Sequence, residues 1–217
     1  MAVHTRRIIN LLVGAVVAAA VLAPAASAQY PPPPGPDPST MAIGVADLPP
    51  GSIVTQQGAT KMPGADSAYQ RTFVLRPRAA RAAGFVVLDS TVALYSDATA
   101  ASEIFAMVRK AFGSRAGRRA FARAVAQDSG VPVRRVKVGS PADLHVGDES
   151  FGVPVAVRLR GATVREVFSL ARVDRAIARV VTVSPASAAS LMRRTAAMLD
   201  KSAQHIRGAL LAPAASR

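Results

Sequence analysis

The sequence predicts an α+β domain in which an antiparallel sheet carries helices on one face and a long amphipathic helix closes the chain. Three observations lead to this prediction. Segments rich in Val, Leu and Phe alternate with a period of two and end at turn residues, as strands do. Two helical patterns interrupt these segments over residues 97–127, and an apolar stripe of helical period covers residues 186–210. Strands grouped around separate helices are typical of the α+β class.

Strands are expected wherever apolar residues alternate between turn residues. Tight turns at Gly161 and at Asp174-Arg175 predict that the last three strands form a meander. The segment 131–138 is expected at an edge of the sheet or as a connection. The expected strands cover residues 52–55, 69–75, 84–95, 131–138, 150–160, 162–173 and 175–183.

Capping residues predict where the two central helices begin and end. Ser96 or Asp97 can cap the first helix, because a short polar side chain there accepts a hydrogen bond from the exposed amides of the first turn. Gly113 ends this helix. Ser114 then caps a second helix that we expect to continue through Gln127.

The N-terminus has the pattern of a secretory signal peptide over residues 1–28. Arg6 and Arg7 supply the basic start, residues 8–22 supply the apolar run, and small side chains end at Ala28. Signal peptidase requires such small residues before its cleavage site, so we expect cleavage between Ala28 and Gln29. An uncleaved anchor, and export by a twin-arginine route, are alternatives that the sequence leaves open.

The organisation that follows is a proline-rich linker, one domain and a tail. Seven of the nine residues in 30–38 are Pro or Gly, which favours an extended spacer. We expect the linker over residues 29–45, a single α+β domain over 46–210 and a disordered tail over 211–217. Because the chain has no cysteine, it has neither a lipoprotein anchoring site nor disulfides. The expected location is secreted or extracytoplasmic, without a lipid anchor.

Positive charge is concentrated in the middle of the chain. Without Arg6 and Arg7, the 27 basic residues become 25 against 13 acidic ones, a formal charge of +12. Within 109–137 only Asp128 opposes nine basic residues, which makes this segment the candidate site for an anionic ligand. The candidate ligand-binding residues are Arg109, Lys110, Arg115, Arg118, Arg119, Arg123, Arg134, Arg135 and Lys137.

The expected partners of this segment are an anionic cell-wall polymer or a membrane surface, or else an envelope protein. Readers of nucleic acid usually add exposed aromatic side chains for stacking. Phe105, Phe112 and Phe121 have helical spacing and are expected in the core instead, so no specific nucleic acid is expected.

Residue types for catalysis are sparse. The sequence has no Gly-x-Ser-x-Gly, no Ser-x-x-Lys and no phosphate-cradling glycine loop, and we expect no cofactor and no metal. His145, Asp148 and Glu149 share one loop and are the candidate site of a hydrolase, which ranks last among the hypotheses. The favoured interpretation is a non-catalytic binding or sensor-like module. The alternative is an accessory envelope protein that acts through a protein partner.

The layout also resembles a known group of domains. The order of elements, the turn Val146-Gly147-Asp148-Glu149-Ser150 and the closing helix are similar to secreted actinobacterial domains. These are the extracellular sensor domains of mycobacterial serine/threonine kinases and the PsbP-like mycobacterial lipoproteins. The resemblance covers residues 47–206, implies binding of a ligand or partner without catalysis, and supplies no site residues. The chain departs from both types, since such sensor domains carry disulfides and such lipoproteins an anchoring cysteine.

Overall fold

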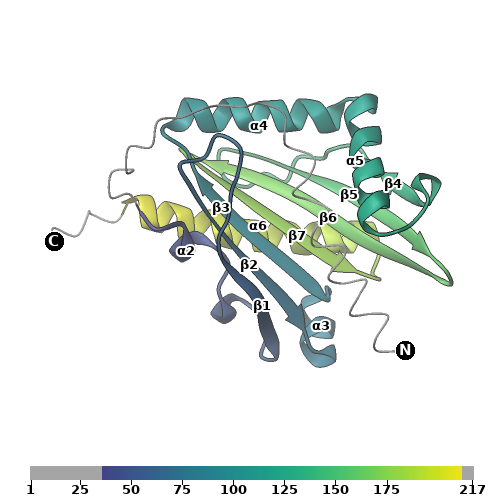
Figure 1. Cartoon of the computed structure of the whole chain (residues 1–217). Coiled ribbons are helices and arrows are strands. Elements are labelled where there is room, and N and C mark those ends of the chain that lie inside the picture. Colours follow the sequence, from purple (N-terminus) through teal and green to yellow (C-terminus); the bar gives the residue numbers. More distant parts are fainter. Residues whose placement is uncertain (1–35, 212–217) are drawn as a thin grey trace.

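A seven-stranded antiparallel sheet forms the centre of the protein (Figure 1). The computed structural model describes residues 36–211. The predicted signal peptide, its cleavage site at Ala28 and residues 212–217 of the predicted tail therefore lie outside the described residues. The strand order is β1-β2-β3-β7-β6-β5-β4, so β7 lies in the middle and β1 and β4 form the edges.

The strands follow the predicted alternation closely, and the last three form the predicted meander. Their bounds are β1 Ser52–Ala59, β2 Ser67–Leu75, β3 Val87–Leu94, β4 Val136–Val138, β5 Glu149–Leu159, β6 Ala162–Val173 and β7 Ala176–Ser184. The predicted strand 131–138 is shorter than expected, because residues 133–135 form a 3-10 turn before β4 begins.

The helices and turns complete the α+β class that the sequence predicts. Their bounds are α2 Pro38–Met41, η2 Val45–Asp47, α3 Pro77–Ala83, α4 Ala98–Gly113, α5 Arg115–Asp128, η3 Val133–Arg135 and α6 Ala188–Leu211. The predicted caps are confirmed, since Asp97 accepts a hydrogen bond from the amide of Ala100 and Ser114 accepts one from the amide of Gly117. Among the described residues, no helix is both long and apolar enough to span a membrane.

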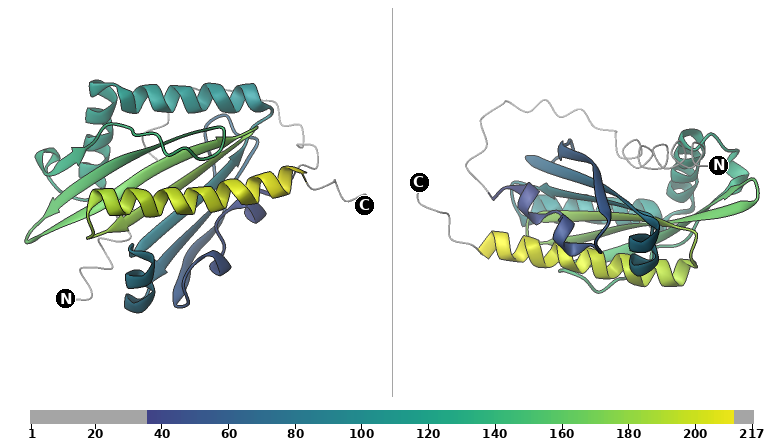
Figure 2. Two further views of the ribbon diagram at one scale, coloured as in Figure 1. Left: turned by 180° about the vertical axis from the view of Figure 1, so that it is seen from behind. Right: turned by 90° about the horizontal axis from the view of Figure 1, so that it is seen from below.

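Helices cover both faces of the sheet, whereas the prediction placed them on one. On one face, α4 and α5 pack over a core that includes Phe105, Phe112 and Phe121. On the other face lies α6, with α2 beside it, and it buries Leu191 and Leu199 (Figure 2). The central strand β7 explains the difference, because all nine of its residues are buried. A single helical layer would leave the other apolar face of this strand in water.

The folded region also reaches further toward the N-terminus than the predicted boundary at residue 46. Met41 and Ile43, within the predicted linker, are fully buried against the α6 face of the sheet. Arg71 and Ser90 hold this segment by hydrogen bonds to the backbone of Ile43. Residues 41–43 thus belong to the core and close the end of the α6 layer.

Candidate functional site

A groove lies at one edge of the sheet, between α5 and the segment made of η3 and β4. Its cavity has a volume of about 420 Å³. Arginines of α5 line one wall, and apolar side chains form the floor. The lining residues are Arg115, Arg118, Arg119, Arg123, Ala122, Val133, Val136 and Val138. The fold therefore brings together four of the nine basic residues proposed from the sequence.

A tight turn between α4 and α5 orients α5 so that its arginines line this groove. The Ser114 hydroxyl donates to the carbonyl of Ala111 and accepts from the amide of Gly117, each at 2.9 Å. A Cβ atom at Gly117 would overlap the Ala111 carbonyl oxygen, so the two helices approach as closely as only glycine permits. The turn thereby sets the direction of α5.

Aromatic packing anchors the same turn to the sheet. The ring of Phe112 lies 5.0 Å from that of Phe121 and 5.1 Å from that of Phe168 on β6, measured between centroids. These rings are buried, as the sequence predicts for Phe112 and Phe121. The Phe112–Phe121 pair is edge-to-face, a geometry that adds roughly 1 kcal/mol beyond the area it buries. The arginine wall therefore stands on a rigid support.

The four arginines of the wall differ in the contacts that they make. Arg118 donates through Nη1 to the carbonyls of Phe112 and Gly113, both at 2.8 Å, and so completes the C-terminal end of α4. Arg115, Arg119 and Arg123 are exposed and lie four residues apart. Side chains with this spacing form one row along a helix. Three guanidinium groups are thus presented together.

The electrostatic environment of this row is unfavourable for the helix itself. The N-terminus of a helix carries partial positive charge and favours acidic side chains. The first turn of α5 has no acidic residue and begins with Arg115. Within residues 36–211, none of Arg115, Arg119 and Arg123 has a carboxylate within ion-pair distance. An anion placed here would relieve the repulsion, and guanidinium groups bind phosphate and carboxylate in two-pronged geometry.

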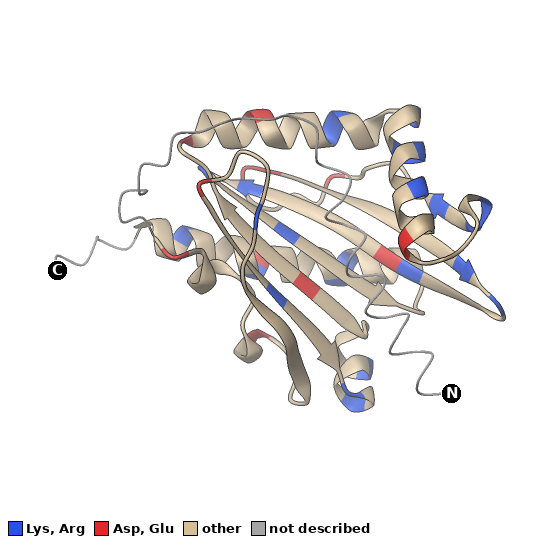
Figure 3. Cartoon of the chain, viewed as in Figure 1, with Lys and Arg blue, Asp and Glu red and all other residues tan. Residues whose placement is uncertain are grey.

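The other predicted basic residues are not part of the groove lining. Arg109 on α4 lies 3.8 Å from Asp143, and Lys110 is exposed on the same helix. Arg134 and Arg135 lie on η3 and Lys137 lies on β4, so they are close in the chain to the groove valines and add to the positive charge of this region. Figure 3 shows basic residues on α5 and at the neighbouring edge of the sheet. A hydrogen bond from the His145 amide and the charges of His145 and Arg109 hold the pKa of Asp143 below its usual range.

The loop proposed as a hydrolase site does not assemble one. The His145 side chain is 88% exposed, and its Nδ1 lies 3.6 Å from a carboxylate oxygen of Asp143. It forms no ion pair with Asp148 or Glu149, the two carboxylates of the predicted site. Asp148 and Glu149 instead bind Arg172, at 3.2 and 2.8 Å. Among the described residues, no group of three or more metal-ligating side chains is close enough to hold a metal ion. The carboxylates of this loop tie it to β6 and orient the turn.

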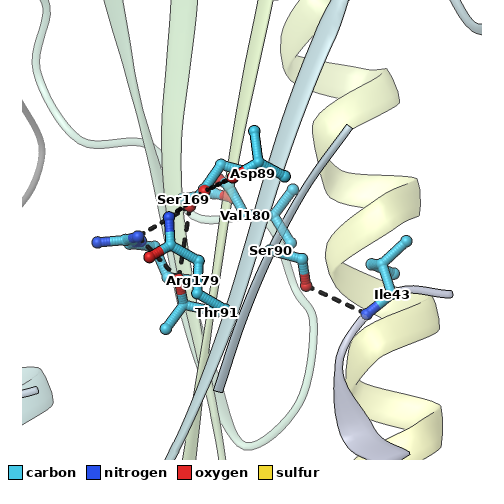
Figure 4. A network of polar contacts seen from close by, with 9 residues as sticks. Ile43, Asp89, Ser90, Thr91, Ser169, Arg179 and Val180 are labelled. Atoms are coloured by element: carbon cyan, nitrogen blue, oxygen red, sulfur yellow. Dashed lines mark hydrogen bonds and ion pairs between the residues drawn. The ribbon is translucent and has the colours of Figure 1, made fainter. Parts of the chain in front are cut away.

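A buried polar network crosses the middle of the sheet (Figure 4). Along β3 and β7, its Asp89 and Arg179 fall in the same alternate positions as residues of the core under α4 and α5, so they lie on that face of the sheet. Asp89 on β3 accepts from the Arg179 guanidinium on β7 at 2.8 Å, and Arg179 also donates to Thr91 at 2.7 Å. Gln70 and Thr72 on β2 donate to the second oxygen of Asp89, at 2.5 and 2.8 Å. Both oxygens of the Asp89 carboxylate thus have partners inside the core, whereas the Nε of Arg179 has no hydrogen-bond partner among the described residues.

Glu166 on β6 belongs to the same face but lacks such partners. It is 2% exposed, and neither carboxylate oxygen has a hydrogen-bond partner among the described residues. Burial raises its pKa to about 8, with a smaller contribution from the Asp89 carboxylate. Glu166 is not among the candidate residues predicted from the sequence, although a charged residue inside a strand otherwise rich in valine is a visible signal.

Comparisons with known proteins leave the family open. No protein-family model matches the chain, and no curated protein matches it. Among solved structures, it is similar to the extracellular domain of PknH from Mycobacterium tuberculosis, at 6% identity and a TM-score of 0.47. The similarity covers 76% of this chain and 94% of that one. At this level it carries no conclusion about function, and the resemblance noted from the sequence stays an expectation.

Proposed function

We propose that this protein is an extracytoplasmic, non-catalytic binding module that holds an anionic ligand in the groove between α5 and β4. The observation that carries the proposal is the row of Arg115, Arg119 and Arg123, which faces a cavity and lacks carboxylate partners among the described residues. The predicted export signal supports the location. The scattered placement of His145, Asp148 and Glu149 supports a non-catalytic role.

The alternative of an accessory protein that docks through its last helix has less support. The apolar stripe of α6 packs on the sheet, where Leu191, Leu199 and Ile206 are fully buried. A docking partner would have to use the polar side of this helix. The groove is therefore the surface on which we base the proposed function.

Binding of a soluble polyanion tests the proposal. The purified protein is titrated with long-chain inorganic polyphosphate at low and high salt, and binding is followed by calorimetry. We expect binding at low salt that weakens at high salt, since ions screen exposed charges. The triple variant Arg115→Gln, Arg119→Gln and Arg123→Gln should bind roughly 10- to 100-fold more weakly, because each exposed pair contributes up to about 1 kcal/mol.

A second triple variant controls for net charge. Arg76, Arg78 and Arg81 are exposed at or near α3, which follows β2 near the opposite edge of the sheet. Their replacement by Gln removes the same charge and should leave polyphosphate affinity nearly unchanged. Equal losses in both variants would show that net charge alone attracts the polymer, and would contradict binding in the groove.

A further inference from the structure

The groove has an apolar floor beside its arginine row, and this pairing indicates the chemistry of the ligand. We propose that the ligand is a lipid-type amphiphile, with a phosphate head that binds the arginines and a hydrocarbon chain that lies on the valines. This inference rests on the proposed function and narrows it to one ligand class.

The valines of the floor continue the hydrophobic core to the protein surface. Alternation along β4 places Val136 and Val138 on the same side and Lys137 on the other. Val136 belongs to the core under α5, and Val138 packs against that core. Val133 on η3 is 47% exposed, so the apolar surface continues out of the core into the groove. Exposed apolar area of this kind favours a ligand that covers it with hydrocarbon.

The wall supplies positive charge that is not paired with a carboxylate among residues 36–211. Arg115, Arg119 and Arg123 have no carboxylate within ion-pair distance among residues 36–211, while Arg118 is bound to the end of α4. Their row lies along the same cavity as the valines. A single ligand can therefore place an anionic head on the wall and an apolar chain on the floor.

Two other ligand classes fit the lining less well. A nucleic acid would use aromatic rings for base stacking, and the side chains that line the groove include none. A simple polymer of phosphate would use the arginines and leave Val133 exposed to water. A phosphate-bearing lipid uses both surfaces, because it removes apolar area from water while its head neutralises the arginines.

A series of soluble alkyl phosphates tests this inference. Ethyl, butyl, hexyl and octyl phosphate are titrated below their micelle concentrations, with inorganic phosphate and octyl glucoside as references. We expect affinity to rise about two- to fourfold for each added methylene until the chain outgrows the floor. Octyl glucoside should bind much more weakly than octyl phosphate, because it lacks the anionic head.

Substitution of the groove valines tests the contact with the hydrocarbon chain separately from the contact with the phosphate. Val133→Ser together with Val138→Thr should flatten the dependence on chain length, because it should weaken binding of octyl phosphate much more than binding of ethyl phosphate. Ile53→Ser on β1 is the matched control, since Ile53 is 43% exposed at the other edge of the sheet. It should leave the chain-length dependence intact.

The outcomes distinguish this inference from the proposed function. If polyphosphate binds through the arginine row but affinity does not change with chain length, the amphiphile is excluded and the anion-binding function stands. If an acidic peptide binds more tightly than octyl phosphate, the ligand class is likewise wrong. If none of the anionic probes responds to the arginine substitutions, both proposals fail.

Discussion

Replacing Glu166 by Gln should change how the stability of the fold depends on pH. Glu166 is buried beneath the α4–α5 layer without hydrogen-bond partners among the described residues. Desolvation, together with the Asp89 and Asp128 carboxylates, raises its pKa to about 8, against an opposing effect of Arg179. The folded protein therefore holds the neutral acid at neutral pH, and Gln has nearly the same shape without the ability to ionise.

The sign and size of the effect follow from the two pKa values. The folded pKa lies above the ordinary value of 4.5, so the contribution of Glu166 to stability is fully present below pH 4.5. It is lost as pH rises toward 8, because the unfolded chain releases this proton first. At about 1.4 kcal/mol for each pH unit, the whole interval corresponds to roughly 5 kcal/mol.

Urea denaturation between pH 5 and pH 9, followed by circular dichroism, measures this effect. The difference in unfolding free energy between Glu166→Gln and the wild type should increase by several kcal/mol from pH 5 to pH 9. This difference should be largest at pH 8 and above. The slope of the unfolding free energy against urea concentration should be the same in both proteins, since both expose the same surface on unfolding. A difference between the two proteins that does not change with pH would refute the reasoning.

Three further substitutions test contacts that hold the fold together. Arg179→Met should destabilise the fold by about 3–5 kcal/mol, because it leaves the Asp89 carboxylate buried without its ion-pair partner; an unchanged thermal midpoint would contradict this. Phe121→Ala should cost about 3–5 kcal/mol in urea denaturation by opening a cavity under α5, and a cost below about 1 kcal/mol would mean that the turn between α4 and α5 repacks. Gly147→Ala should cost about 1–3 kcal/mol in the same assay, because Gly147 has φ +68° and an added Cβ would overlap the Arg172 carbonyl; full stability would show that the turn can shift.

Two short segments of the fold could not be predicted from local sequence patterns. The helix α3 begins at Pro77, which predicts the end of a strand and is equally suited to the first turn of a helix. Seven residues carry too little periodic pattern to identify a helix, and so short a helix depends on tertiary contacts for its stability. Residues 41–43 likewise have the sequence of a linker, and only their contacts with the sheet and α6 show that they belong to the core.

The sequence by itself determined the α+β class, the meander, the caps of α4 and α5 and the concentration of basic residues within 109–137. Each of these depends on residues near one another in the chain, through periodicity, turn chemistry or capping. Only the tertiary structure decided that helices cover both faces, that Val133 and Val138 lie opposite the arginines, and that Asp89 meets Arg179 ninety positions away. Those relations depend on strand order and on how α5 docks against the sheet edge, which no local pattern encodes.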